Sequence, residues 1–130
     1  MKRRLIICVD DEKAVLETLE RQLSQALGEN FVIEVAQSPQ EAWEIIEDGN
    51  DGLELSLVIS DWLMPEVRGD KFLVDLHAKH PHVNKIMLSG QADPDAVENA
   101  KKNANLDAFV SKPWDIQKLA QLVAQTAQEK

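Results

Sequence analysis

The sequence has one cysteine and no apolar run long enough to cross a membrane. Cys8 lies inside the apolar run 5–9, so we expect a buried structural thiol, and one cysteine excludes an intrachain disulfide or a cysteine metal cluster. The opening MKRR and five apolar residues look like the start of a signal peptide. Asp10-Asp11 ends that run short of the roughly 7–15 apolar residues required. We therefore expect a soluble, cytoplasmic protein with no membrane segment.

Positive charge is also scarce. Lys and Arg number 14 against 23 Asp and Glu, which gives a formal net charge of −9. Phosphate backbones and anionic lipids repel such a chain, so we expect no direct partnership with nucleic acid or a membrane surface. No GxGxxG turn, P-loop or GxSxG elbow occurs, which excludes nucleotide and hydrolase sites of those types. The length of 130 residues predicts one domain, residues 1–130.

Short apolar runs alternate with amphipathic segments along the chain. The runs typical of strands are residues 5–9, 31–35, 55–60, 83–88 and 106–111. Apolar residues recur at helical spacing after each run, and the predicted helices begin near Val15 and at the capping residues Ser38, Asp70, Asp93 and Asp115. Pro39 and Glu41 add a first-turn proline and a capping box to Ser38. The alternation predicts an α/β fold with a parallel sheet covered on both faces.

The predicted strands end in polar residues. In a sheet of this kind, function gathers at the carboxyl ends of the strands. The second strand ends in Ala36-Gln37, which carries nothing distinctive, but the other four end in Asp10-Asp11, Asp61, Ser89 and Lys112-Pro113. Three carboxylates, a hydroxyl and an amine at one edge indicate a site.

Each of these residues alone has a simpler interpretation. An Asp at a strand end is commonly a turn former or helix cap, Lys112 could be a solvated surface lysine, and Ser89 could form the turn before Gly90. As a group, however, like charges about 4 Å apart cost about 4 kcal/mol per pair at an effective dielectric near 20, so the cluster needs a cation or a raised pKa. Oxygen ligands with open positions suit Mg²⁺ (or Mn²⁺). The set favours metal binding, and one Asp could cap a helix as well.

The ordered set of residues resembles the receiver domain of bacterial two-component response regulators. The resemblance covers essentially the whole chain and rests on Asp10-Asp11, Asp61 with Met64-Pro65, Ser89, Phe109 and Lys112-Pro113. Each dipeptide is common, but the full set, with each member at the end of its own strand, is specific. The resemblance implies a flavodoxin-like, doubly wound (βα)5 fold with strand order 2-1-3-4-5.

The resemblance also implies a role for each residue. Asp61 is the phosphoacceptor. Asp11 and Asp61 bind Mg²⁺ directly, together with the backbone carbonyl of Leu63, and Asp10 acts mostly through water. Ser89 and Lys112 hold the phosphoryl oxygens. Phe109 stands where an aromatic residue swings inward in the family; it is either a switch residue or plain core, and it lacks the hydroxyl of the more frequent Tyr.

A receiver domain implies protein partners. A histidine kinase or a histidine phosphotransfer protein supplies the phosphoryl group, and an output domain or downstream protein contacts the face made by the fourth helix, fifth strand and fifth helix. The fourth helix has a thin, Ala-rich apolar side, and weakly packed elements move at low cost. We therefore expect a phosphorylated switch that is not an enzyme, with any output enzyme activity outside this chain.

Two other functions remain open. A covalent-aspartate phosphatase of the haloacid dehalogenase type needs a second Asp two residues after the nucleophile, where this chain has Leu63. A pseudo-receiver that serves only as a protein-interaction scaffold usually loses site residues, and none is lost here.

Histidines and tryptophans outside this set are expected to be structural. His77, His80 and His82 surround Pro81 at a predicted helix end, away from the polar edge, so a surface role is favoured over metal binding or phosphotransfer. Trp43 and Trp114 are expected to be packing or surface residues.

Overall fold

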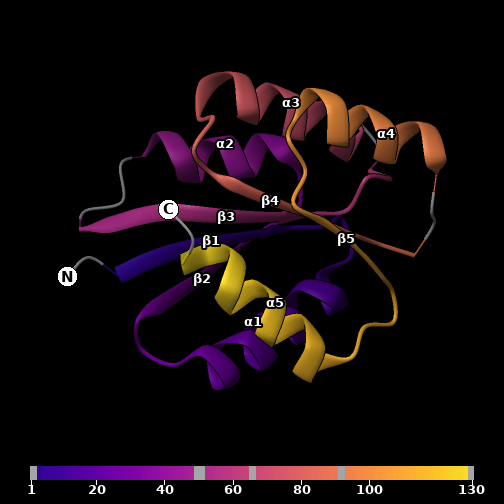
Figure 1. The fold of residues 1–130 in the computed structure, drawn as a ribbon. Coiled ribbons are helices and arrows are strands. Elements are labelled where there is room, and N and C mark those ends of the chain that lie inside the picture. The colour runs from indigo at the N-terminus through magenta and orange to yellow at the C-terminus, as the bar shows by residue number, and fades with distance from the viewer. Residues whose placement is uncertain (1–2, 49–51, 65–66, 91–92, 129–130) are drawn as a thin grey trace.

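The computed structural model describes residues 3–48, 52–64, 67–90 and 93–128. In these residues, five strands alternate with five helices (Figure 1). The strands are β1 (Arg3–Val9), β2 (Phe31–Ala36), β3 (Leu53–Ser60), β4 (Asn84–Ser89) and β5 (Ala108–Ser111), and the helices are α1 (Lys13–Leu27), α2 (Pro39–Glu47), α3 (Gly69–Lys79), α4 (Pro94–Asn103) and α5 (Ile116–Gln128). All strand pairs are parallel, in the order β2-β1-β3-β4-β5, which confirms the predicted fold class and strand order.

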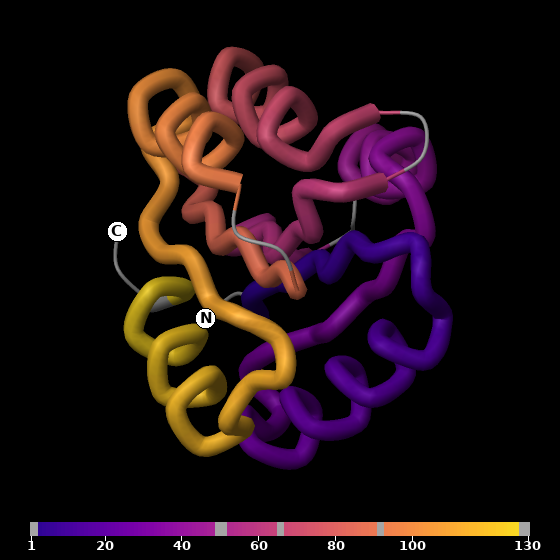
Figure 2. The backbone as a smooth tube through the Cα atoms, turned by 90° about the vertical axis from the view of Figure 1, so that its right-hand side faces the viewer, coloured from indigo at the N-terminus to yellow at the C-terminus, as the bar shows by residue number. Residues whose placement is uncertain are grey.

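Helices cover both faces of the sheet. α2, α3 and α4 lie on one face, and α1 and α5 lie on the other (Figures 1 and 2). Along β1, Leu5, Ile7 and Val9 pack in the first layer, and Ile6 and Cys8 pack in the second. A parallel strand buried on both faces has a continuous apolar sequence, which is why residues 5–9 contain no polar side chain.

Cys8 is fully buried, as predicted. Burial raises the pKa of its thiol to about 12, and the negative charges of Glu20 and Asp10 add to the shift. Because the thiolate is the reactive form, this cysteine is an inert member of the core.

Three of the predicted capping residues cap their helices. Ser38 accepts a hydrogen bond from the N–H of Glu41, Asp93 from that of Asp95, and Asp115 from that of Gln117. The capping box is displaced by one residue, because the Glu41 carboxylate accepts from the N–H of Gln37, which precedes the cap. None of the helices within the described residues has the length and apolar character needed to span a membrane.

The prediction that Asp70 caps the third helix is wrong. α3 begins at Gly69, and Arg68, two residues before Asp70, occupies the cap position without a side-chain capping bond. The Gly69 N–H donates to the carbonyl of Trp62 at 2.7 Å, which fixes the helix start. Asp70 therefore lies in the first turn, where its carboxylate accepts hydrogen bonds from Arg68 and Asn99.

His77 lies in the last turn of α3, His80 is the C-cap residue of that helix, and His82 lies in the loop before β4. All three are at the edge of the sheet opposite the carboxyl ends of the strands. His82 is exposed, in agreement with the predicted surface role, but His77 and His80 are partly buried. The tryptophans pack as predicted. Trp43 contacts Phe72 edge to face, with ring centroids 5.5 Å apart, and the Trp114 indole N–H donates to a side chain of α1.

Candidate functional site at the carboxyl edge of the sheet

Parallel register brings the ends of several strands to one level. Val9 of β1 pairs with Ser60 of β3, so the two strands stop together. One more backbone bond continues each ladder past the strand: the Asp61 N–H donates to the Val9 carbonyl, and the Lys112 N–H donates to the Ser89 carbonyl, both at 3.0 Å. The side chains that follow these strands therefore lie at one edge of the sheet.

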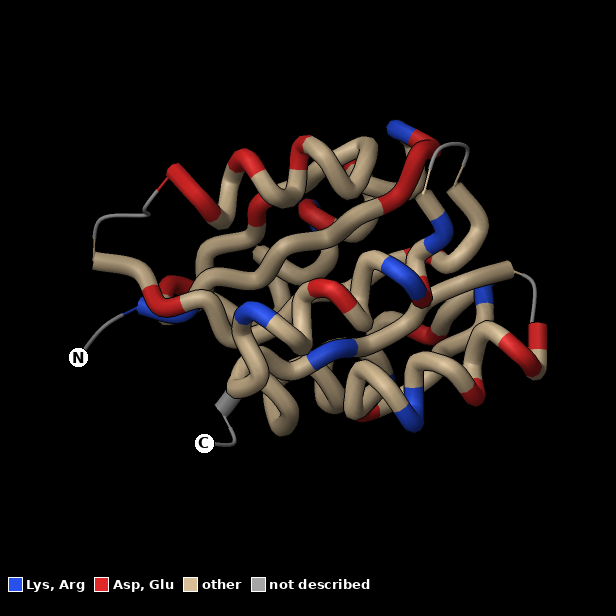
Figure 3. The backbone as a smooth tube through the Cα atoms, turned by 90° about the horizontal axis from the view of Figure 1, so that it is seen from above, with Lys and Arg blue, Asp and Glu red and all other residues tan. Residues whose placement is uncertain are grey.

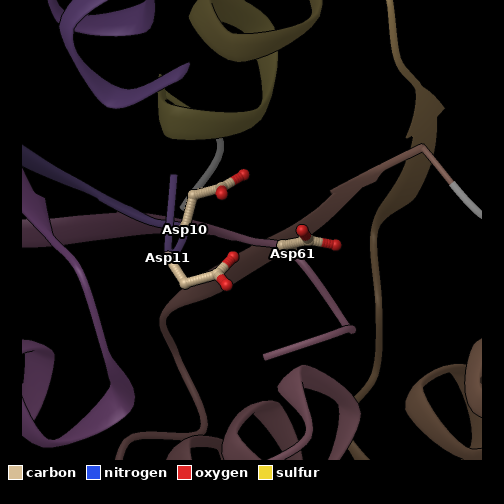
Figure 4. A group of neighbouring side chains, drawn as sticks. All are labelled: Asp10, Asp11 and Asp61. Carbon is tan, nitrogen blue, oxygen red and sulfur yellow. The ribbon is translucent and has the colours of Figure 1, made fainter. Parts of the chain in front are cut away.

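Asp10, Asp11 and Asp61 form one cluster of carboxylates (Figure 4). One oxygen of each residue lies within 4.8 Å of the others. Asp10 is 2% exposed and Asp61 is 7% exposed, whereas Asp11 faces solvent. The structure thus joins the three acidic residues singled out in the sequence, and two of them are nearly dehydrated.

Neither Asp10 nor Asp11 caps α1. The cap position belongs to Glu12, which makes no side-chain capping bond. Asp10 instead accepts the Glu12 N–H on Oδ1 at 2.9 Å and the Lys112 ammonium on Oδ2 at 2.6 Å. Across the described part of the chain, no hydrogen bond or ion pair holds the Asp11 side chain. Asp11 is therefore the carboxylate of the cluster that is free to take a ligand.

The Lys112 side chain reaches the cluster from the end of β5. Its ammonium lies 2.6 Å from Oδ2 of Asp10 and 3.3 Å from Oδ2 of Asp61. Burial by itself would lower the pKa of Lys112, but the hydrogen bond and charge of Asp10, together with the charge of Asp61, raise it above its ordinary value. Lys112 is thus a fixed positive charge, and the alternative of a solvated surface lysine does not hold.

The environment of Asp10, by contrast, disfavours the charged form of its side chain. Burial raises the pKa of this carboxyl above its ordinary value, and the charge of Asp61 adds to the shift. The hydrogen bonds from Lys112 and from the Glu12 N–H compensate only in part. The ionised form of Asp10 therefore costs free energy that the Lys112 ammonium does not fully offset.

The cluster borders an open cavity of about 530 Å³. Five predicted site residues line it, namely Asp11, Asp61, Leu63, Ser89 and Lys112. Met64 of the predicted motif also lines it, as do Glu12 and Gly90, which were given no role in the site. Ser89 is 2% exposed, and the Leu63 side chain projects into solvent. Pro65, which follows Met64 in the predicted motif, lies outside the described residues.

Gly69 supports the site and was missed in the sequence. A Cβ at this position would lie 1.8 Å from the carbonyl oxygen of Asp61. The loop after β3 therefore folds directly onto the first residue of α3, and only glycine leaves room for that approach. The signal available in the sequence was a glycine directly before Asp70, the acidic residue of the first helical turn.

Phe109 lies on β5, opposite Met87 of β4. Its ring is partly exposed and packs against the core layer beneath α2, α3 and α4. It is therefore neither a fully buried core residue nor a free surface residue, and both predicted roles stay open.

The donor set fits Mg²⁺ or Mn²⁺. Oxygens bound to one Mg²⁺ at about 2.0–2.1 Å are separated by at most about 4.2 Å, so the observed spacing needs only small side-chain rotations to close. Hard carboxylate oxygens at a water-accessible edge are the ligands that these ions select. Both oxygens of Asp10 accept short hydrogen bonds, of 2.9 and 2.6 Å. Those accepted by Asp61 are longer, at 3.3 Å each, and Asp11 accepts none within the described residues, so the geometry favours Asp11 and Asp61 as direct ligands.

Comparisons with known proteins identify the family of the chain. The family model of the response regulator receiver domain matches residues 6–124. The sensor kinase CckA of Brucella abortus is 35% identical over 118 residues, which is 91% of this chain and 12% of CckA. The response regulator Rre1 of Synechocystis is 30% identical over 121 residues, 91% of this chain and 49% of Rre1. The chain thus spans half or less of the length of these curated relatives.

A solved structure supports the same assignment. The signal receiver domain of an HD domain-containing protein from Pseudomonas fluorescens Pf-5 superposes with a TM-score of 0.87 at 26% identity, and covers 98% of this chain and 89% of that one. The chain belongs to the response regulator receiver domain family. Members of this family are signalling switches that bind Mg²⁺ at an acidic pocket and work with histidine kinases and output domains.

The close approach of Gly69 gives a stability prediction. Gly69→Ala forces the loop after β3 away from α3, because the clash is with backbone atoms. We expect urea melts to show a loss of about 1–3 kcal/mol. Gly90→Ala is the matched control, since its Cβ would meet nothing nearer than Cδ of Lys112 at 3.9 Å, and it should cost less than about 0.5 kcal/mol. Equal melts for the two variants would contradict the tight packing.

The raised pKa of Asp10 gives a pH prediction. The folded protein binds this proton more tightly than the unfolded chain, so the contribution of Asp10 to stability is greatest below its unfolded pKa of about 4 and declines as pH rises through the folded pKa. Asp10→Asn removes this decline. In urea melts with chelator, the unfolding free energy of the variant minus that of wild type should therefore increase from about pH 4 to about pH 7. A decrease in this difference would mean that the hydrogen bond from Lys112 lowers the pKa of Asp10 by more than burial raises it.

Proposed function

We propose that this chain is a phosphoacceptor domain in which Asp61 receives a phosphoryl group from a phosphohistidine of a histidine kinase or a histidine phosphotransfer protein. The observation that carries the proposal is the contact of one Lys112 ammonium with the carboxylates of both Asp10 and Asp61, at the border of a cavity wide enough for a phosphoryl group. A structural ion pair would need one carboxylate, not a cluster of three.

Asp61 supplies the nucleophile. A carboxylate oxygen of Asp61 attacks phosphorus, the O–P bond forms as the P–N bond of the phosphohistidine breaks, and the imidazole nitrogen leaves with the electron pair and takes up a proton. The Leu63 N–H donates to Oδ1 of Asp61 at 3.3 Å, which orients the carboxylate for this attack. The product is an aspartyl phosphate.

Lys112 and Ser89 stabilise the transferred group. Lys112 already lies 3.3 Å from Asp61, so its ammonium is in reach of the oxygens of a phosphoryl group placed there. Ser89 borders the same cavity from the end of β4. Both groups act by charge and hydrogen bonding on a transition state whose charge is spread over the phosphoryl oxygens.

Asp11, Asp61 and the backbone carbonyl of Leu63 would hold Mg²⁺ directly, and Asp10 would contribute through water. When bound, the ion supplies positive charge that neutralises the carboxylates and the incoming phosphoryl oxygens. Asp10 also has a structural role, because its two hydrogen bonds fix the loop after β1 and the position of Lys112.

The switch face would be formed by α4, β5 and α5. Only alanines are fully buried on α4, namely Ala96 and Ala100, and β5 is a four-residue strand at the edge of the sheet. Such lightly packed elements change position at low cost. Movement of Ser89 toward a phosphoryl group would let Phe109 turn inward, and an output domain or downstream protein would bind the altered face.

Intact-mass measurement tests the transfer. Incubation of wild type with acetyl phosphate and Mg²⁺ should add one phosphoryl group that base or hydroxylamine removes, because acyl phosphates are labile. Asp61→Asn should gain none. Asp75→Asn, which changes an exposed Asp of α3 away from the cavity, is the matched control and should react like wild type. Steady turnover of acetyl phosphate without a stable adduct would favour the phosphatase, and no reaction at all would favour the scaffold.

Urea melts test the metal site independently of transfer. Mg²⁺ at tenfold excess over its Kd should stabilise wild type by about 1.4 kcal/mol, from RT ln(1 + [Mg²⁺]/Kd). Asp61→Asn and Asp11→Asn should each lose most of this gain, and Asp75→Asn should keep it. A Mg²⁺ effect that is equal in all four proteins would place the ion elsewhere.

A further inference from the structure

One further buried carboxylate, that of Asp70, lies outside the candidate functional site. Acidic residues are spread over most of the backbone (Figure 3). Within the described residues, however, the buried ones are Asp10, Asp61 and Asp70. The first two belong to the cluster, and the third, at 2% exposure, has no part in the chemistry proposed above.

Asp70 joins three structural elements. Its Oδ1 accepts from Nε of Arg68 at 3.0 Å, and its Oδ2 accepts from Nη2 of Arg68 and from Nδ2 of Asn99, both at 2.9 Å. Asn99 lies in α4, and its own Oδ1 accepts from Nδ2 of Asn103 at 2.7 Å. A polar link therefore runs from the loop before α3, through the first turn of α3, to the last turn of α4.

The link begins beside the phosphoacceptor. The Arg68 guanidinium lies 5.5 Å from the centre of the Trp62 ring, and Trp62 directly follows Asp61. The Trp62 carbonyl also accepts the N–H of Gly69, next to Asp70. Displacement of the Asp61–Trp62 segment would therefore act on the residue that donates twice to Asp70.

A buried charge makes this link stiff. A carboxylate removed from water pays a large penalty unless each of its donors stays in place, and a bidentate Arg–carboxylate pair also fixes geometry. Arg68 and Asn99 reach the same carboxylate from different elements, so neither moves without weakening the hold on Asp70. The hydrogen bond from Asn99 to Asp70 contributes more to the position of α4 than such a bond usually would, because the buried apolar side chains of that helix are small.

We propose that Asp70 is a positioning residue that couples the loop carrying Asp61 to α4 through Arg68 and Asn99. The coupling is separate from the Ser89 and Phe109 route, since it passes through the start of α3 and not along β4 and β5. That phosphorylation is the event that moves the loop rests on the proposed function; the mechanical link itself does not. In a purely local role, Asp70 would only place negative charge at the start of α3.

The first test uses the free protein and amide hydrogen exchange, resolved by peptide, over residues 94–103. Arg68 contacts Asp70 and Trp62, and none of its contacts described above is with α4. Even so, Arg68→Ala should speed exchange in α4 at least about threefold, and Arg68→Lys, which keeps the charge but not the bidentate fork, should fall between it and wild type. Lys71→Ala, which removes the neighbouring exposed cation, is the control and should leave α4 unchanged. Unchanged α4 exchange in Arg68→Ala overturns the proposal.

The second test adds Mg²⁺ and beryllium fluoride, a non-transferable stand-in for a phosphoryl group. In wild type, tryptophan emission and α4 exchange should both respond, and Trp62→Phe should lose most of the emission response, which assigns that response to Trp62. Asn99→Ala should keep the Trp62 response and lose more than half of the α4 response, whereas the neighbouring exposed variant Glu98→Ala should keep both. A full α4 response in Asn99→Ala, or a wild-type α4 that ignores the probe while Trp62 responds, overturns the coupling. If Trp62 itself ignores the probe, the proposed function fails, and the free-protein test alone decides the link.

Discussion

One ammonium group between two buried carboxylates is the contact on which this edge of the protein depends. Lys112 lies at the end of β5, whereas Asp10 and Asp61 follow the adjacent strands β1 and β3. The parallel register places these carboxylates together, and the charge that makes their proximity tolerable comes from the other side of β4. Without Lys112, two like charges would stay dehydrated with no partner of opposite sign, which is among the most costly arrangements in a protein interior.

The Lys112 ammonium compensates the negative charge of the carboxylates only in part. The cluster has three carboxylates beside the ammonium of Lys112, and burial raises the pKa of Asp10 in spite of its bond to that ammonium. A divalent cation would complete the balance, and a phosphoryl group on Asp61 would upset it again by adding negative charge beside Lys112. The same excess of negative charge accounts for the fit to Mg²⁺, and it would make the site sensitive to the phosphorylation proposed above.

Stiffness is distributed unevenly over the fold. β1 is bonded on both sides and buried on both faces, so the loop that carries Asp10 and Asp11 starts from a rigid strand. Toward the other end of the sheet, β5 is short and α4 is packed through alanines. A rigid site next to a lightly held face suits a switch, and the bonds of Asp70 to Arg68 and Asn99 give α4 a specific connection to that site.

Local patterns in the sequence determined the alternation of strands and helices, the caps at Ser38, Asp93 and Asp115, and the polar residues at the strand ends, because each depends only on neighbours along the chain. Strand order came from a family resemblance and not from the pattern itself. Tertiary structure alone decided which carboxylates Lys112 contacts, why residue 69 is glycine, and that Asp70 binds Arg68 and Asn99 and does not cap α3. The contacts of Lys112 with the carboxylates and of Asn99 with Asp70 join segments far apart in the sequence, and a pattern with a period of a few residues carries no information about such contacts. Arg68 is close to Asp70 in the sequence, but the conformation of the loop before α3 decides their contact.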